Sequence, residues 1–250
     1  MASALFDLSL ALADDALVLG HRLSEWSSRA PTLEEDIALS NLGLDLIGQA
    51  RLFYALAGAL EGQGRDEDQL AYFRDAVDYR CLGLVQLPRG DFAFTMARQL
   101  AFAAFMEAYF DLMRRSTEPR LAEIAAKAVK EMAYHVRHAA EWVIRLGDGT
   151  AESRRRLQQG LADVWPYTGE LFEMSESERQ LVTAGIAPDR TALRDGWTKM
   201  MSRVLREAGL DMPTAVGSFT GGRVGAHTPH LAPMLAEMQS LARAHPGATW

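Results

Sequence analysis

Apolar residues recur at intervals of three and four along almost the whole chain, and this helical period constrains the fold more than any other feature. In the first segment Leu5, Leu12, Leu19 and Trp26 keep a heptad spacing. Strictly alternating runs are few and β-branched residues are sparse, which argues against strands. Because the helical segments are long and the breaks between them are short, the pattern predicts an all-α protein built as an antiparallel helical bundle with additional helices.

Proline, glycine and capping residues mark where the helices begin and end. Thr32 is a predicted N-cap, followed by carboxylates that suit the positive end of a helix. The predicted helices cover approximately residues 3–28, 32–62, 66–87, 92–115, 118–146, 153–172, 189–208 and 233–244. Pro166 is expected to kink or split the sixth helix, and residues 212–229 are predicted to be irregular. No Ser/Gly linker divides the chain, so residues 1–250 are expected to form a single domain.

Charge balance and cysteine content exclude several classes of protein. The chain has 26 Lys and Arg against 33 Asp and Glu, a net charge of −7, and its basic residues form no stripe, so nucleic acid is not an expected partner. Cys81 is the single cysteine of the sequence, which excludes an intramolecular disulfide and predicts a small buried residue. No apolar run reaches the ~20 residues of a membrane span, and the first residues resemble no targeting signal. We therefore expect a cytoplasmic protein with no membrane partner.

A helical bundle of this size prompts a search for a carboxylate-bridged di-metal site. Such a site takes one Glu from each of two helices and a Glu-x-x-His pair from each of two others. In the predicted helix 118–146 Glu131 is followed at i+3 by Tyr134, and His135 comes one position too late. In the second helix the corresponding places are held by Asp45 and Gly48, so the carboxylate is short and the imidazole is missing. The di-metal pattern is therefore degenerate in both helices.

Other possible metal ligands remain, and they leave two possibilities: a carboxylate of a di-metal site and a single zinc ion. Glu107 is an inward candidate on the fourth helix, where Leu100 and Ala104 share its face. A zinc ion on Glu131 and His135 would need a third ligand, for which His138 is the candidate.

These residues also have an ordinary structural interpretation. Glu131 and His135 lie on the flank of an apolar helix face, a place typical of half-exposed or interface surface. Asp45 would then form a salt bridge to a nearby arginine, Arg51 or Arg98. If the carboxylates of positions 45, 107 and 131 all point inward, their mutual repulsion must be relieved, which predicts an internal polar network that includes His135.

Two further features suggest contact with a partner protein. Phe102, Phe105, Tyr109 and Met113 lie on one face of the fourth helix and are predicted to form a helix-on-helix interface. The Gly-rich segment 217–230 is expected to lie over such a partner, because glycine lets backbones approach closely. The two histidines at its end, in a His-x-x-His pair, are interpreted as part of a loop that caps a protein surface rather than as metal ligands.

Several long strings of the sequence resemble one known family closely. They include the segments Asn41–Arg51, Lys130–His135, Arg145–Thr150, Thr220–Thr228 and Pro233–Gln239, together with the terminal Trp250. The resemblance covers essentially the whole chain, and it is specific because the strings are long and ordered. The family is the structural, non-catalytic subunit of the bacterial multicomponent phenylacetyl-CoA oxygenase, also called the 1,2-epoxidase.

The resemblance implies a fold, partners and a division of labour. The fold would be ferritin-like, over a single domain of residues 1–250. A sister subunit of the same fold would carry the di-iron centre and bind phenylacetyl-CoA, and a reductase subunit with flavin and an iron–sulfur centre would pass electrons from NADPH. This chain would hold no cofactor, no metal and no catalytic residue, and would support the subunit that epoxidises the aromatic ring. The alternative is a self-sufficient di-iron or zinc enzyme that uses Glu107, Glu131, His135 and Asp45, against which Tyr134 and Gly48 both count.

Overall fold

The computed structural model describes residues 1–214 and 219–248, and the regular elements of these two ranges are all helical. Four of the helices are long: α1 (Ala2–Ser24), α2 (Leu33–Glu61), α5 (Phe92–Met113) and α6 (Pro119–Asp148). The shorter ones are α3 (Glu67–Tyr72), α4 (Gly83–Gln86), α7 (Ala151–Val164), α8 (Glu176–Thr183), α9 (Arg194–Glu207) and α10 (Leu231–Ala244). Short 3₁₀ turns cover Ala76–Asp78, Trp165–Tyr167, Gly169–Phe172, Thr191–Leu193 and Gly222–Val224. The all-α prediction is confirmed.

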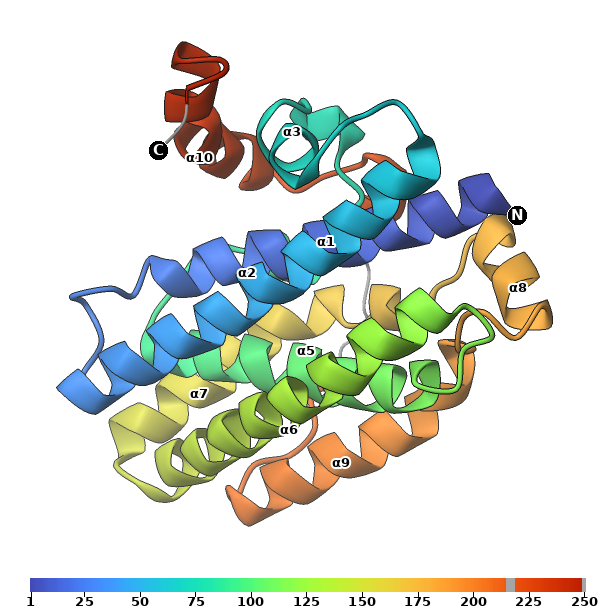
Figure 1. Cartoon of the computed structure of the whole chain (residues 1–250). Coiled ribbons are helices and arrows are strands. Elements are labelled where there is room, and N and C mark those ends of the chain that lie inside the picture. The colour runs from blue at the N-terminus through green and yellow to red at the C-terminus, as the bar shows by residue number, and fades with distance from the viewer. Residues whose placement is uncertain (215–218, 249–250) are drawn as a thin grey trace.

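The long helices pack as two antiparallel pairs. Figure 1 shows α1 and α2 side by side above α5 and α6. Helices α7 and α9 pack against the α5–α6 pair, while α3 and α10 lie together on the other side of α1 and α2 (Figure 1). The heptad of α1 is buried in this arrangement, and the apolar side chains of all the long helices join in one core cluster.

Local sequence signals explain the α1–α2 pair. The side chain of Thr32 caps α2 by accepting a hydrogen bond from the Glu35 amide, and Gly62 ends α2 in the left-handed conformation that favours glycine. Gly20 and Gly43 face each other where the two helices touch, since a Cβ on either would lie 3.2–3.3 Å from the carbonyl oxygen of the other. The absence of side chains at both positions lets the two backbones come close.

Helix α5 is the central helix, and one prediction about it is wrong. Phe102, Phe105, Tyr109 and Met113 are buried within this chain and form no outer interface. The Phe105 ring packs edge-on against Phe172, at 5.5 Å between ring centroids, and the chain after α6 covers the rest of this face. The face is apolar because segments that follow it in the sequence return to cover it, which local periodicity does not reveal.

The predicted helix 66–87 is also wrong, because buried carboxylates capture its backbone. The amide of Arg80 donates to Asp14 at 2.7 Å, and the amide of Leu82 donates to Asp15 at 2.8 Å. These backbone N–H groups are therefore taken by carboxylates of α1 rather than by carbonyl groups one turn earlier. Only α3, a 3₁₀ turn and the four-residue α4 remain of the predicted helix.

The other predicted elements agree with the structure in outline. The sixth predicted helix splits near Pro166 into α7 and two 3₁₀ turns, as expected. Helix α1 ends at Ser24, four residues before its predicted end, and α8 was not predicted at all. Cys81 is buried, as predicted. In the part of the chain that the structure describes, no helix combines the length and the apolar character needed to cross a membrane.

The C-terminal segment folds back over its own chain. Arg223 forms an ion pair with Asp15 at 2.5 Å and donates to the Arg80 carbonyl at 2.7 Å. The buried carboxylate of Glu170 accepts from the amides of Gly83 and Gly222, both at 2.7 Å. Residues 219–230 thus cap this chain, while positions 217 and 218 lie outside the described residues.

Candidate functional site

Part of the predicted degenerate di-metal site, Asp45 and Glu131 with the nearby His135, meets along the line where α2 and α6 touch. We call the group Asp45, Gln49, Glu131 and His135 the α2–α6 seam. Asp45 and Gln49 lie one turn apart on α2, and Glu131 and His135 lie one turn apart on α6, so each pair points the same way. Gln99 of α5 reaches the seam from behind and is fully buried.

His135 is the buried centre of the seam. Its Nδ1 accepts a hydrogen bond from the Gln99 amide at 2.9 Å, and its Nε2 faces Asp45 Oδ2 at 3.3 Å. This arrangement suits a neutral imidazole that donates from Nε2 to the carboxylate. Burial lowers the pKa of His135, and the hydrogen bond to Asp45 opposes that shift only in part. His135 thus lies in an internal set of polar contacts, as predicted, but Glu107 does not take part in them.

Glu131, one turn before His135 on α6, is held by other donors. Its Oε2 accepts from the side-chain amide of Gln49 at 2.8 Å, and its Oε1 lies 3.5 Å from the ammonium group of Lys127. The two seam carboxylates are thus each engaged by a neutral or cationic donor of this chain. Hydrogen bonds between side chains tie α2, α5 and α6 together at this point.

The arginine partners predicted for Asp45 are wrong. Arg51 lies on the exposed side of α2 and pairs with Glu67 at 3.2 Å. Arg98 is buried and donates to the carbonyl groups of Leu87 and Pro88. Neither side chain approaches Asp45, because Arg51 is turned outward and Arg98 is held by the loop before α5.

Glu107 and His138 do not converge on the seam. Within residues 1–214 and 219–248, no hydrogen bond joins Glu107 to the network. Burial raises the pKa of Glu107, and the charge of Asp111 adds to the rise. His138 pairs with Glu35 at 2.9 Å instead of completing a zinc site with its neighbours. Across the described ranges, no three His, Cys, Asp or Glu side chains gather closely enough to hold a metal ion.

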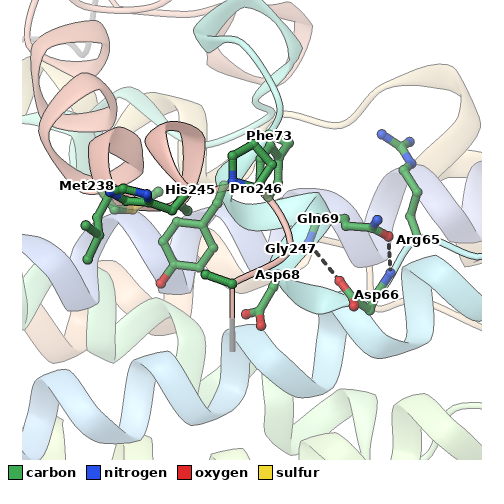
Figure 2. A pocket seen from close by; sticks show the side chains of 13 residues that line it. Arg65, Asp66, Asp68, Gln69, Phe73, Met238, His245, Pro246 and Gly247 are labelled. Carbon is green, nitrogen blue, oxygen red and sulfur yellow. Dashed lines mark hydrogen bonds between the residues drawn. The ribbon is translucent and has the colours of Figure 1, made fainter. Parts of the chain in front are cut away.

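A cavity elsewhere in the molecule offers no better site. It has a volume of about 780 Å³ and lies between α3 and the end of α10 (Figure 2). Part of its polar wall is the capping box of α3, in which Asp66 and Gln69 hydrogen-bond to each other's backbone amides. Phe73 and Met238 contribute apolar wall. Because the groups of the capping box already satisfy each other, that part of the wall does not mark a place where a substrate is held.

Comparison with known proteins shows the family of the chain. A family model described as "phenylacetic acid catabolic protein" matches residues 1–250. The chain belongs to this family. It is 46% identical over 242 residues to one of the subunits of the 1,2-phenylacetyl-CoA epoxidase of Escherichia coli (strain K12), and the match covers 97% of each chain. The ferritin-like fold implied by the sequence resemblance is the fold of this phenylacetic acid catabolic family.

The two positions at which a Glu-x-x-His pattern would need histidine, Gly48 and Tyr134, make none of the seam contacts. Gly48 is on the outer side of α2, where an added Cβ would have no atom within 4 Å. Tyr134 is exposed, its ring lies beside that of His138, and the Arg137 guanidinium stands 5.2 Å from its centre. Sequence reasoning missed Gln99 and Glu35 as members of the polar contacts. Gln99 could have been found from the sequence, because it is a polar residue at a core position of the apolar helix α5.

Proposed function

We propose that this chain is the structural subunit of a phenylacetyl-CoA epoxidase complex in phenylacetate catabolism, and that its role is to support the di-iron subunit that epoxidises the ring. The observation that carries this proposal is the 46% identity to a subunit of the E. coli epoxidase over 97% of both chains. Membership of a multisubunit enzyme implies other subunits as partners. We propose a di-iron subunit of the same fold and a reductase with flavin, an iron–sulfur centre and NADPH, rather than nucleic acid or membrane.

We also propose that this chain has no catalytic residue and binds no metal or other cofactor. The seam supports this because Asp45 faces His135, and Glu131 accepts from Gln49. A metal ion would have to displace these hydrogen bonds and would still lack ligands, since Gly48 has no side chain and the Tyr134 side chain is exposed. The same observations count against a self-sufficient di-iron or zinc enzyme.

In this proposal the hydrogen bonds of the seam hold the helices in place relative to one another, as a bound metal ion does in a catalytic bundle. Hydrogen-bonded side chains at a helix junction restrict which helix faces meet, because losing a partner in the interior is costly. His135 and Gln99 connect α6 to α5, and Asp45 connects α6 to α2. We further propose that residues 1–250 form one domain and act in the cytoplasm.

Metal analysis and reconstitution test the proposal. After anaerobic loading with ferrous iron, the purified chain is expected to hold no stoichiometric iron, and alone it should not turn over phenylacetyl-CoA. Turnover by the di-iron subunit and reductase should depend on adding this chain. Two irons per chain that are lost in Glu131→Ala and kept in Glu123→Ala, a change at an exposed site of the same helix, would overturn it. So would full activity of the other subunits in its absence.

A further inference from the structure

Helix α2 carries an apolar stripe on its outer side. The outward positions follow one another at spacings of four, four, three, four, four and three residues, which keeps them on one face of the helix. They are Leu33, Ile37, Asn41, Leu44, Gly48, Leu52 and Ala55. We call these seven residues the α2 outer stripe. None of them is charged, and Leu33, Ile37 and Leu44 are 72%, 54% and 65% exposed.

The opposite side of α2 is apolar as well. Leu39, Leu42, Leu46 and Phe53 are fully buried against the rest of the bundle. A helix that faces water on one side is expected to be polar on that side, whereas a helix that is apolar all round is normally enclosed. Single exposed leucines need no explanation, but an uncharged stripe over six helical turns does. Helix α2 therefore carries an uncharged, largely apolar stripe at the outside of the bundle, with the exposed side chains of Glu34 and Arg51 beside it (Figure 1).

The stripe is shaped to receive another helix. Gly48 lies near its middle with open space above it, so a partner backbone or a bulky side chain can approach closely there. Tyr134 of α6 is 41% exposed, and its ring stacks beside that of His138, which pairs with Glu35 of α2. It adds an aromatic side chain of the kind enriched in interfaces. Lys130 and Arg137 flank Tyr134 on the exposed side of α6. A partner with carboxylates at the matching edge would complement them.

The size of the surface fits a stable interface. Leu33 and Ala55 are 22 residues apart, so the stripe is about 33 Å long at the helical rise. With the exposed flank of α6 the surface is about 20 Å wide, two helix diameters. It therefore offers on the order of 700 Å² per partner, close to the ~800 Å² of a standard stable interface, and its apolar character is typical of obligate ones.

We infer that the α2 outer stripe, with Tyr134 of α6, is the surface on which the di-iron subunit docks through one of its own helices. This inference rests on the proposed function, and it names the face that the function requires. The surface predicted from the sequence, on α5, is buried inside this chain. The α2 outer stripe is the exposed apolar helix face that takes its place. The polar contacts of the seam lie directly beside it and hold α2 against α6, which keeps the docking surface rigid.

The test is co-expression of this chain with the di-iron subunit, followed by size-exclusion chromatography with light scattering. Leu44→Asp and Ile37→Asp place a carboxylate in the stripe, and Leu241→Asp is the matched control at an exposed leucine of α10. Wild type and the control should co-elute with the di-iron subunit. Each stripe variant should bind at least ~30-fold more weakly, the effect of losing one central interface residue. Circular dichroism of each free variant should match wild type, because the altered residues are exposed.

The outcomes separate the two proposals. If wild type fails to co-elute with the di-iron subunit, the proposed function fails. If wild type co-elutes and both stripe variants do so equally well, the function stands and the docking surface is wrong. If wild type alone runs as a dimer that Leu44→Asp disrupts, a second copy of this chain occupies the stripe, which also overturns the inference.

Discussion

Replacing Glu170 by glutamine tests how the C-terminal segment is held. The Glu170 side chain is 1% exposed, and its two oxygens accept from the amides of Gly83 and Gly222, both at 2.7 Å. Glutamine keeps one acceptor oxygen but turns an NH₂ group toward the other amide. The change therefore removes one hydrogen bond to a charged acceptor, worth about 1.5–3 kcal/mol, and leaves a buried N–H unsatisfied at a further cost of about 1–3 kcal/mol.

Part of that loss is offset, because glutamine carries no charge that must be buried. Burial raises the pKa of Glu170, which means that the folded protein bears a penalty for the charge that glutamine does not. We expect a net loss of about 2 kcal/mol in the free energy of unfolding. For a chain of this size that corresponds to a fall of about 4–8 °C in Tm.

Urea unfolding followed by circular dichroism measures the loss. Glu176→Gln is the matched control, because it makes the same chemical change at an exposed site of α8 whose ion pair with Arg179 is on the surface. The control should change the unfolding free energy by less than about 0.5 kcal/mol. Equal stability of Glu170→Gln and the control would refute the claim that this carboxylate joins α4 to the C-terminal segment.

Three further predictions concern the helices around the seam. Because burial lowers the pKa of His135 below its unfolded value, the unfolded chain binds the proton first, and stability should fall as pH drops from about 7 through the unfolded pKa near 6.5. Urea unfolding at pH 7.5 and 5.5 should give a smaller difference for His135→Gln than for wild type, and an unchanged difference would contradict this. Gly43→Val should lower Tm because overpacking costs about 1–3 kcal/mol. Gly48→Ala should raise stability by up to about 1 kcal/mol, since its Cβ meets open space.

The long helices were predictable because their information is local. The apolar period, the Thr32 cap and the Gly62 stop lie within the segments that they define, and the structure follows them closely. Residues 66–87 were not predictable, because their backbone is fixed by Asp14 and Asp15, which come more than fifty residues earlier. Periodicity describes the secondary structure that a segment prefers by itself. It carries no information about a carboxylate, distant in the sequence, that accepts hydrogen bonds from the amides of the segment.

The seam was predictable in part for the same reason. The spacing within α2 and within α6 placed Asp45, Glu131 and His135 on faces that meet, which the structure confirms. The partners were harder, because Gln99 and Glu35 belong to other stretches of the chain. The prediction that the apolar face of α5 is an outer interface was wrong for a related reason, since α2 has an apolar face that stays exposed. Both are apolar, and only the path of the later segments decides which one is covered.

The ion pair between Arg223 and Asp15 joins positions 208 residues apart, which bears on how the protein is made. At ~5–20 residues per second, the ribosome adds Arg223 ~10–40 s after Asp15. Through that interval α1 carries a carboxylate that is costly to bury unpaired. Helix α1 can therefore reach its final stability only when synthesis is almost complete. A chain that ends before Arg223 lacks this cation, and of its hydrogen bonds within the described residues Asp15 then keeps only the one from the Leu82 amide.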